Sequence, residues 1–268
     1  MARSAGVGKR STMNRITSLF KNKKSRILNI YCTAGFPSLN STIEVMKALQ
    51  ENGADMIELG MPYSDPLADG PVIQASSSRA IQNGMTITRL FSDLKEFRKD
   101  IHVPVILMGY MNPALQYGFE KFCASAAAAG IDGLILPDLP MYEFETEYGE
   151  IIEKYGLKFI FLVTPETSDE RIRMLDRLST GFLYAVSSSS TTGNEKSLEQ
   201  QMGYFKKLQE MKLNNSVLIG FGIKDSQTFN AACRYANGAI IGTAYIRALE
   251  QNGSVKEVTK KFIDGIVG

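Results

Sequence analysis

The feature that most constrains the fold is a repeated alternation of short apolar runs with longer amphipathic segments. Eight runs carry apolar residues at nearly every position rather than at every second one. This pattern is typical of strands that are buried on both faces of a parallel sheet. The segments between the runs have helical spacing of apolar residues, with polar residues or glycine at their ends. The runs are residues 26–35, 56–60, 105–110, 133–138, 158–163, 182–187, 216–222 and 238–244.

Eight β-then-α units in 268 residues predict a single-domain α/β fold, the (β/α)₈ TIM barrel. The pattern indicates two helical stretches after the second strand, at 71–83 and 86–99, and a short extra helix after the eighth, within 243–253. A doubly wound open sheet is the competing fold. The first strand lacks a GxGxxG turn, and no linker or change of composition divides the chain, so the barrel is favoured.

The first residues, MARSAGVGKRSTM, are small, polar and basic, and they lack the apolar core of a signal peptide. We expect residues 1–12 to be an expression-derived or disordered extension. Residues 13–268 are expected to form the catalytic barrel domain.

Charge and cysteine content exclude several classes of protein. The net charge of +2 gives no reason to expect binding to nucleic acid or membrane, and no apolar run approaches the ~20 residues of a membrane span. The three cysteines, Cys32, Cys123 and Cys233, lie far apart and show neither disulfide nor metal spacing. The cytoplasm is the expected location, with the cysteines interpreted as buried residues and a thiol nucleophile as the alternative.

The segment ELGMPYSDPLADGP, residues 58–71, contains three carboxylates and no basic residue. Glu58 lies near the end of an apolar strand and Asp69 lies in the following loop, so in a barrel both face the catalytic end. Burial would raise the pKa of Glu58 and make it a proton carrier, although a structural Glu bonded to backbone is the alternative. Asp69 could hold an N–H group or a developing positive charge. Asp65 precedes Pro66 and is interpreted as a turn residue.

Other catalytic groups are poorly placed. His102 is the only histidine and precedes the third strand, at the opposite end of a barrel, which disfavours a Ser-His-Asp triad despite the serines at 187–190. Lys158 begins the fifth strand and Lys224 lies in a loop, so Schiff-base chemistry is also disfavoured. The carboxylates are therefore expected to transfer the protons, without a metal ion.

Glycines follow the sixth, seventh and eighth strands in SSSSTTGN, GFGIKD and IIGTAYIRALEQNG. Barrel enzymes bind phosphate with the loops after strands seven and eight and the first turn of a short extra helix. We expect Gly193, Gly222, Gly242 and Thr243 to bind a phosphate through backbone N–H groups. The residues thus predict acid–base chemistry on a phosphorylated substrate.

The segment ELGMPYSDPLADGP resembles the signature of the tryptophan synthase alpha subunit family, and the resemblance extends from ITSLF (16–20) to the C-terminus through TAGFP, PVILMGYMNP, PDLP and GFGI. It implies a carbon–carbon lyase of tryptophan biosynthesis that cleaves indole-3-glycerol phosphate to indole and glyceraldehyde 3-phosphate. It also implies an α₂β₂ assembly in which a beta subunit carries PLP and accepts the indole, with no cofactor in this chain.

The resemblance assigns a role to each matching position. Glu58 is the main acid–base group, Asp69 accepts the indole N–H, and Tyr184 lies near the glycerol portion. Thr192 belongs to a closing loop, and Thr243 replaces a familiar serine. The expected phosphate pocket is formed by Gly193, Phe221, Gly222, Gly242 and Thr243, and the expected indole pocket by Tyr31, Ile73, Leu107 and Leu162.

One segment departs from the family pattern. VSSSSTTGN lacks an arginine near Ser188 and a glycine near Ser190, which puts the closure kinetics in doubt but not the chemistry. Two alternatives remain. One is a lyase that works without a beta subunit, and the other is a phosphate-binding barrel that has lost catalysis and only activates the beta subunit. The loops that carry Asp65 and Asp69, and a further loop at residues 111–118, are expected to form part of the partner interface. For 111–118, folding back onto the core is the alternative.

Overall fold

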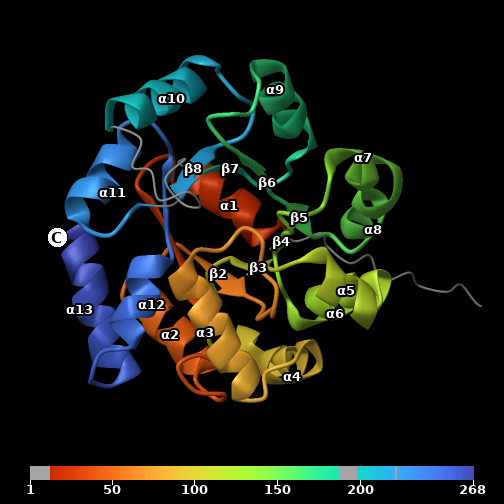
Figure 1. Ribbon diagram of the computed structural model, residues 1–268, viewed down its shortest axis with the longest axis vertical. Coiled ribbons are helices and arrows are strands. Elements are labelled where there is room, and N and C mark those ends of the chain that lie inside the picture. The colour runs from red at the N-terminus through yellow and green to blue at the C-terminus, as the bar shows by residue number, and fades with distance from the viewer. Residues whose placement is uncertain (1–12, 187–197, 221) are drawn as a thin grey trace, which may run out of the picture.

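A computed structural model describes residues 13–186, 198–220 and 222–268, with the side chains of 198–201 excepted. Parallel strands lie in the centre, and helices surround them (Figure 1). The strands are β1 Ile27–Thr33, β2 Met56–Gly60, β3 Val105–Met108, β4 Gly133–Ile135, β5 Lys158–Phe159, β6 Phe161–Val163, β7 Leu183–Val186, β8 Val217–Gly220 and β9 Gly238–Ile241.

The helices follow the strands as the sequence pattern predicts, with additions. The α-helices are α1 Arg15–Asn22, α2 Thr42–Glu51, α3 Pro71–Gln82, α4 Ile87–Asp93, α5 Met111–Tyr117, α6 Phe119–Ala129, α7 Met141–Glu143, α8 Gly149–Lys154, α9 Asp169–Leu178, α10 Leu198–Glu210, α11 Ser226–Cys233, α12 Thr243–Leu249 and α13 Val255–Val267. A 3₁₀-helix, η1 Leu94–Lys99, extends α4, and a π-helical turn, η2 Phe144–Tyr148, joins α7 to α8. Among these described helices, none is long and apolar enough to cross a membrane.

The fifth predicted strand is divided into two short strands. β5 pairs with β4, and β6 pairs with β7, so the sheet order is β5-β4-β3-β2-β1-β9-β8-β7-β6. Because β5 and β6 are separated only by Ile160, the sheet closes into a barrel apart from this break. The prediction of a (β/α)₈ TIM barrel is confirmed, and the extra helix after the last strand is α12.

The segment 111–118 differs from the prediction. The sequence predicts a loop here, but Met111–Tyr117 forms α5, which begins directly after Tyr110. Met111 and Ala114 are buried, whereas Leu115 is 46% exposed. The apolar residues of this segment are therefore explained by an amphipathic helix that packs one face on the barrel.

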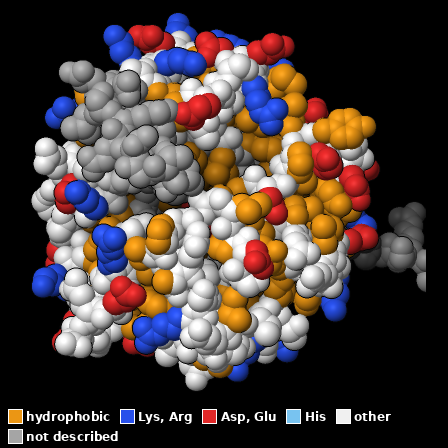
Figure 2. Space-filling model, in the orientation of Figure 1, with side chains coloured by type: hydrophobic (Ala, Val, Ile, Leu, Met, Phe, Trp, Pro, Cys, Tyr) orange, Lys and Arg blue, Asp and Glu red, His pale blue; other side chains and the backbone are white. Residues whose placement is uncertain are grey.

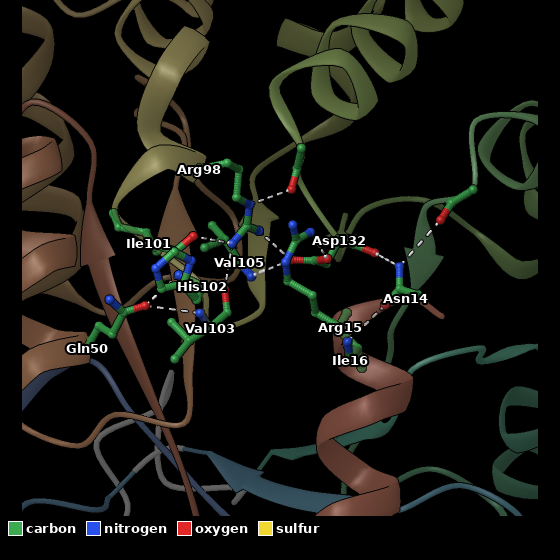
Figure 3. A network of polar contacts seen from close by, with 12 residues as sticks. Asn14, Arg15, Ile16, Gln50, Arg98, Ile101, His102, Val103, Val105 and Asp132 are labelled. Carbon is green, nitrogen blue, oxygen red and sulfur yellow. Dashed lines mark hydrogen bonds and ion pairs between the residues drawn. The ribbon is translucent and has the colours of Figure 1, made fainter. Parts of the chain in front are cut away.

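The N-terminal end of the barrel is covered by α1, which the sequence pattern did not predict. Ile16 of α1 is fully buried and packs against Gly133 at the start of β4 and Gly181 just before β7. Near it, Asp132 accepts hydrogen bonds from the Val105 N–H at 2.9 Å and from Nη1 of Arg15 at 3.1 Å, and it pairs with Arg98 (Figure 3). His102 is exposed at this same end, as its position in the sequence predicts.

Candidate active site

Glu58 is a buried acid inside the barrel. It lies in β2, only 1% exposed, in register with Tyr31 of β1 and Ile106 of β3. Burial raises the pKa of Glu58 to about 8; a hydrogen bond from Asn29 lowers it, and the nearby Asp69 adds to the rise. Most Glu58 side chains are therefore protonated at neutral pH, and the group can give as well as accept a proton.

Asp69 lies in the loop between β2 and α3, and its side chain is held by Tyr110. The Tyr110 hydroxyl donates to Oδ2 of Asp69 at 2.8 Å and accepts from the Ala68 N–H at 3.0 Å. Burial raises the pKa of Asp69, and the hydrogen bond from Tyr110 opposes this rise. The loop and its carboxyl group are thus fixed against the end of β3.

One pocket at the C-terminal end of the barrel contains both acids. Eight of the residues that line the pocket are predicted from the sequence, and three are not: Met108, Ile223 and Ile240. The predicted eight are Tyr31, Glu58, Asp69, Ile73, Tyr184, Gly222, Gly242 and Thr243. No described residue of its lining is basic, and no group of His, Cys, Asp and Glu in the described ranges is arranged to bind a metal ion.

Two glycines make room for the aromatic walls of this pocket. A Cβ atom at Gly60 would lie 2.1 Å from the Tyr31 hydroxyl, and one at Gly220 would lie 2.3 Å from the Tyr184 ring. Any larger residue would therefore displace one of the tyrosines. Sequence reasoning did not identify these positions, although a glycine at the end of an apolar strand is a signal for close approach of another group.

The assignment of Leu107 to the indole pocket is wrong by one residue. Leu107 pairs in register with Leu59 and is fully buried, whereas its neighbour Met108 pairs with Gly60 and lines the pocket. Because successive residues of a strand face opposite sides, Leu107 faces away from Glu58 and toward the helices.

The remaining predicted positions lie elsewhere or are not described. Leu162 is in register with Tyr184 but lines a neighbouring cavity with Ala68 and Leu136. Asp65 is exposed and accepts a hydrogen bond from the Ser64 hydroxyl, in agreement with a turn residue. The predicted site residues Thr192, Gly193 and Phe221 lie outside the described residues.

Tyr184 stands beside the two acids. Its side chain is 5% exposed, and burial raises its pKa well above the ordinary value, with smaller contributions from the charges of Glu58 and Asp69. The hydroxyl therefore stays protonated and can donate a hydrogen bond to a bound substrate. The pocket combines a neutral proton donor, a second carboxyl group and a phenol.

Comparison with known proteins identifies the family. Residues 18–264 match the family model described as tryptophan synthase alpha chain. The tryptophan synthase alpha chain of Parabacteroides distasonis is 48% identical over 255 residues, which cover 95% of this chain and 99% of the relative. The crystal structure of tryptophan synthase subunit alpha from Legionella pneumophila has a TM-score of 0.86 at 34% identity, covering 96% of this chain and 98% of that one. The tryptophan synthase complex from Pyrococcus furiosus contains a chain with a TM-score of 0.83 at 35% identity, covering 91% and 99%. The extent of these matches shows that the chain belongs to the tryptophan synthase alpha chain family.

Proposed function

We propose that Glu58 and Asp69 perform the proton transfer and charge stabilisation of the lyase reaction. The reaction itself follows from membership of the family: the chain is a carbon–carbon lyase that cleaves indole-3-glycerol phosphate to indole and glyceraldehyde 3-phosphate in tryptophan biosynthesis. The observation that carries the assignment of the residues is that both carboxyl groups line one pocket with Gly222, Gly242 and Thr243.

Glu58 begins the reaction as the acid, because its raised pKa of about 8 keeps it protonated at neutral pH. It gives its proton to C3 of the indole ring, which leaves a positive charge on the ring and makes the ring an electron sink. The resulting carboxylate takes the proton of the side-chain hydroxyl as the carbon–carbon bond breaks. The bonding electrons return to the ring, indole and an aldehyde form, and Glu58 is protonated again.

Asp69 accepts the indole N–H and stabilises the positive charge that develops on the ring. A carboxylate stabilises this positive charge better than a neutral amide would. Because the charge appears only after C3 is protonated, the interaction is stronger in the charged intermediate than in the bound substrate. The contact with Tyr110 keeps the Asp69 carboxyl in place before the substrate arrives. Tyr184 lies on the side of the glycerol chain, where its hydroxyl can donate to a substrate oxygen.

The phosphate is proposed to bind at Gly222, Gly242 and Thr243, together with Gly193 and Phe221. Thr243 begins α12, and the first N–H groups of a helix have no partner within the helix. Thr243 is an exposed residue, and its hydroxyl can donate as well. Tyr31, Ile73 and Met108 then supply apolar walls for the flat indole ring, with Leu162 at the edge of the next cavity. We retain Thr192 as part of a closing loop.

The partner is a tryptophan synthase beta subunit in an α₂β₂ heterotetramer, and PLP belongs to that subunit. Exposed apolar side chains on the described surface support a docking face near the pocket. They are Leu67 in the loop that carries Asp69, Leu115 in α5 and Tyr142 in α7, which are 81%, 46% and 71% exposed. Figure 2 shows hydrophobic side chains gathered on the side of α5 and α7.

A cytoplasmic location is proposed, with residues 13–268 as one catalytic domain and residues 1–12 as an extension. All three cysteines are free, and Cys32 and Cys123 are buried, which suits a reducing compartment.

The proposed roles are tested by indole release from indole-3-glycerol phosphate with the parent chain and with Asp69→Asn. The amide still accepts the indole N–H but carries no negative charge, so we expect kcat to fall by about tenfold or more while substrate binding changes little. If only KM rises, Asp69 is a binding residue and its proposed role is wrong. Thr243→Asp should prevent phosphate binding, because it places a negative charge where the phosphate is proposed to bind.

A further inference from the structure

Asn29 is a buried amide that contacts the proposed catalytic acid. It lies in β1, whose sequence ILNIYCT is otherwise mostly apolar, and its side chain is fully buried. Nδ2 of Asn29 donates a hydrogen bond to Oε2 of Glu58 over 3.2 Å. Tyr31, two residues further on, is the register partner of Glu58, so Asn29 lies one layer deeper in the barrel.

The other polar atom of this amide is unsatisfied. Oδ1 of Asn29 is buried and accepts no hydrogen bond from the described residues. Its register partners on the adjacent strands, Met56 and Ile240, are apolar and offer no side-chain N–H or O–H donor. A buried acceptor without a donor costs free energy that an apolar side chain of the same shape would not. Packing alone therefore does not explain an amide here.

A side-chain amide carries one donor group and one acceptor group on the same planar unit. A half-turn about its last torsion exchanges the positions of Nδ2 and Oδ1. Glu58, in the role proposed above, passes from carboxylic acid to carboxylate and back in each reaction. The acid needs an acceptor beside its O–H, and the carboxylate needs a donor beside its oxygen.

We propose that Asn29 is a positioning residue that holds Glu58 in both protonation states. Nδ2 donates to the carboxylate. After the amide rotates by a half-turn about its last torsion, Oδ1 accepts from the O–H of the carboxylic acid. This inference rests on the proposed role of Glu58 in proton transfer. It assigns to Asn29 control of where the Glu58 carboxyl points and how readily it releases its proton.

The other groups around Glu58 cannot take this place. Asp69, Tyr31, Tyr184 and the Cys32 thiol are the titratable neighbours among the described residues, and their negative forms all disfavour the Glu58 carboxylate. Ile106 and Met108 of β3 are apolar. The hydrogen bond from Asn29 is the described contact that lowers the pKa of Glu58.

The test is a pH titration of the Glu58 carboxyl by infrared difference spectroscopy, with the band assigned by its loss in Glu58→Gln. Asn29→Leu keeps the approximate shape and removes both hydrogen bonds. We expect the titration midpoint to rise by about one pH unit and the C=O band of the protonated acid to move to higher frequency. A weaker acid should also lower kcat, by about tenfold.

Two further variants make the result specific. Met56→Leu changes packing beside Asn29 without touching the hydrogen bond, so its midpoint should equal that of the parent. Asn29→Ser supplies a hydroxyl that donates and accepts, and its midpoint should lie between those of the parent and Asn29→Leu. If Asn29→Leu does not fold, Asn29→Ala is measured in its place.

A midpoint that stays within about 0.2 pH unit after loss of the amide would overturn the inference. If the C=O band of the protonated acid keeps its frequency in Asn29→Leu, Asn29 does not contact the acid form of Glu58. The proposal that it holds both protonation states would then be wrong. Failure of the proposed function would give a different experimental result. In that case Glu58→Gln keeps normal turnover, while the band shift caused by Asn29→Leu is still measurable.

Discussion

The hydroxyl of Tyr110 lies 2.8 Å from Oδ2 of Asp69 and joins the end of β3 to the loop that carries the second acid. The same hydroxyl accepts a hydrogen bond from the Ala68 N–H, so one phenol fixes both the backbone and the side chain of this loop. Tyr110 also directly precedes α5. It thus connects the site to a helix on the surface.

Tyr110→Phe should lower kcat by about tenfold or more. The change removes a hydrogen bond to a carboxylate, which contributes ~1.5 kcal/mol or more. It also raises the pKa of Asp69 further, because the hydrogen bond from Tyr110 no longer opposes the effect of burial. KM should change less than kcat. Tyr63→Phe is the matched control, because the Tyr63 ring packs 5.4 Å from the Tyr110 ring but its hydroxyl accepts from Asn112. Equal losses in the two variants would contradict a specific role for Tyr110.

Glu58→Gln should reduce turnover by about 10²–10⁴-fold or more, since one group serves two proton transfers. Gln has nearly the shape of the protonated acid, so circular dichroism and the unfolding transition should show an intact fold. Turnover within threefold of the parent would rule out Glu58 as the main acid–base group.

The same substitution should change how stability depends on pH. The pKa of Glu58 is about 8 in the folded chain against 4.5 ordinarily, so between these values the folded state holds a proton that the unfolded state has lost. The favourable contribution of the acid form is complete below about pH 4.5 and is lost as the pH rises through 8, with a slope of about 1.4 kcal/mol per pH unit. Glu58→Gln removes this slope. Its free energy of unfolding in urea, relative to the parent, should therefore increase from pH 5 to pH 8, and a constant difference would contradict the raised pKa.

Asp132→Asn should destabilise the fold without affecting the chemistry. Asp132 is 3% exposed and Arg98 is 14% exposed, so the substitution leaves a buried guanidinium without its carboxylate, at a cost of ~3–5 kcal/mol. Burial already lowers the pKa of Arg98 to about 10 despite the attraction of Asp132. Glu120→Gln, which breaks the exposed pair with Lys154, is the control and should change the melting temperature little. Normal kcat is expected for folded Asp132→Asn, because the pair lies at the end of the barrel opposite the pocket.

The sequence predicts the fold well because strands buried on both faces have a pattern that a parallel barrel requires. It does not predict the break in KFIFLV, since no glycine or proline marks Ile160. The error between Leu107 and Met108 has a geometric cause: a shift of one residue along a strand moves a side chain to the opposite face. Asn29 and Tyr110 were missed because their contacts with Glu58 and Asp69 join residues 29 and 41 positions apart.

The last prediction concerns coupling between the docking face and the acids. Leu115 projects from α5, and Tyr110 at the start of α5 holds Asp69. A beta subunit that packs on α5 would therefore stabilise the position of the Asp69 carboxyl through Tyr110. Indole release should rise by at least about tenfold with saturating beta subunit, which corresponds to ~1.4 kcal/mol.

Leu115→Glu should weaken this activation, because a charge would be buried in the interface. Pro113 is half-buried in α5, so Leu115 is the better position for such a change. Val267→Glu is the matched control: Val267 is 48% exposed at the end of α13, on another side of the molecule (Figure 1). Tyr110→Phe should bind the beta subunit normally yet respond less to it, since docking is intact but the link to Asp69 is broken. Full activation of both Leu115→Glu and Tyr110→Phe at the same beta concentration as the parent would show that coupling does not pass through α5.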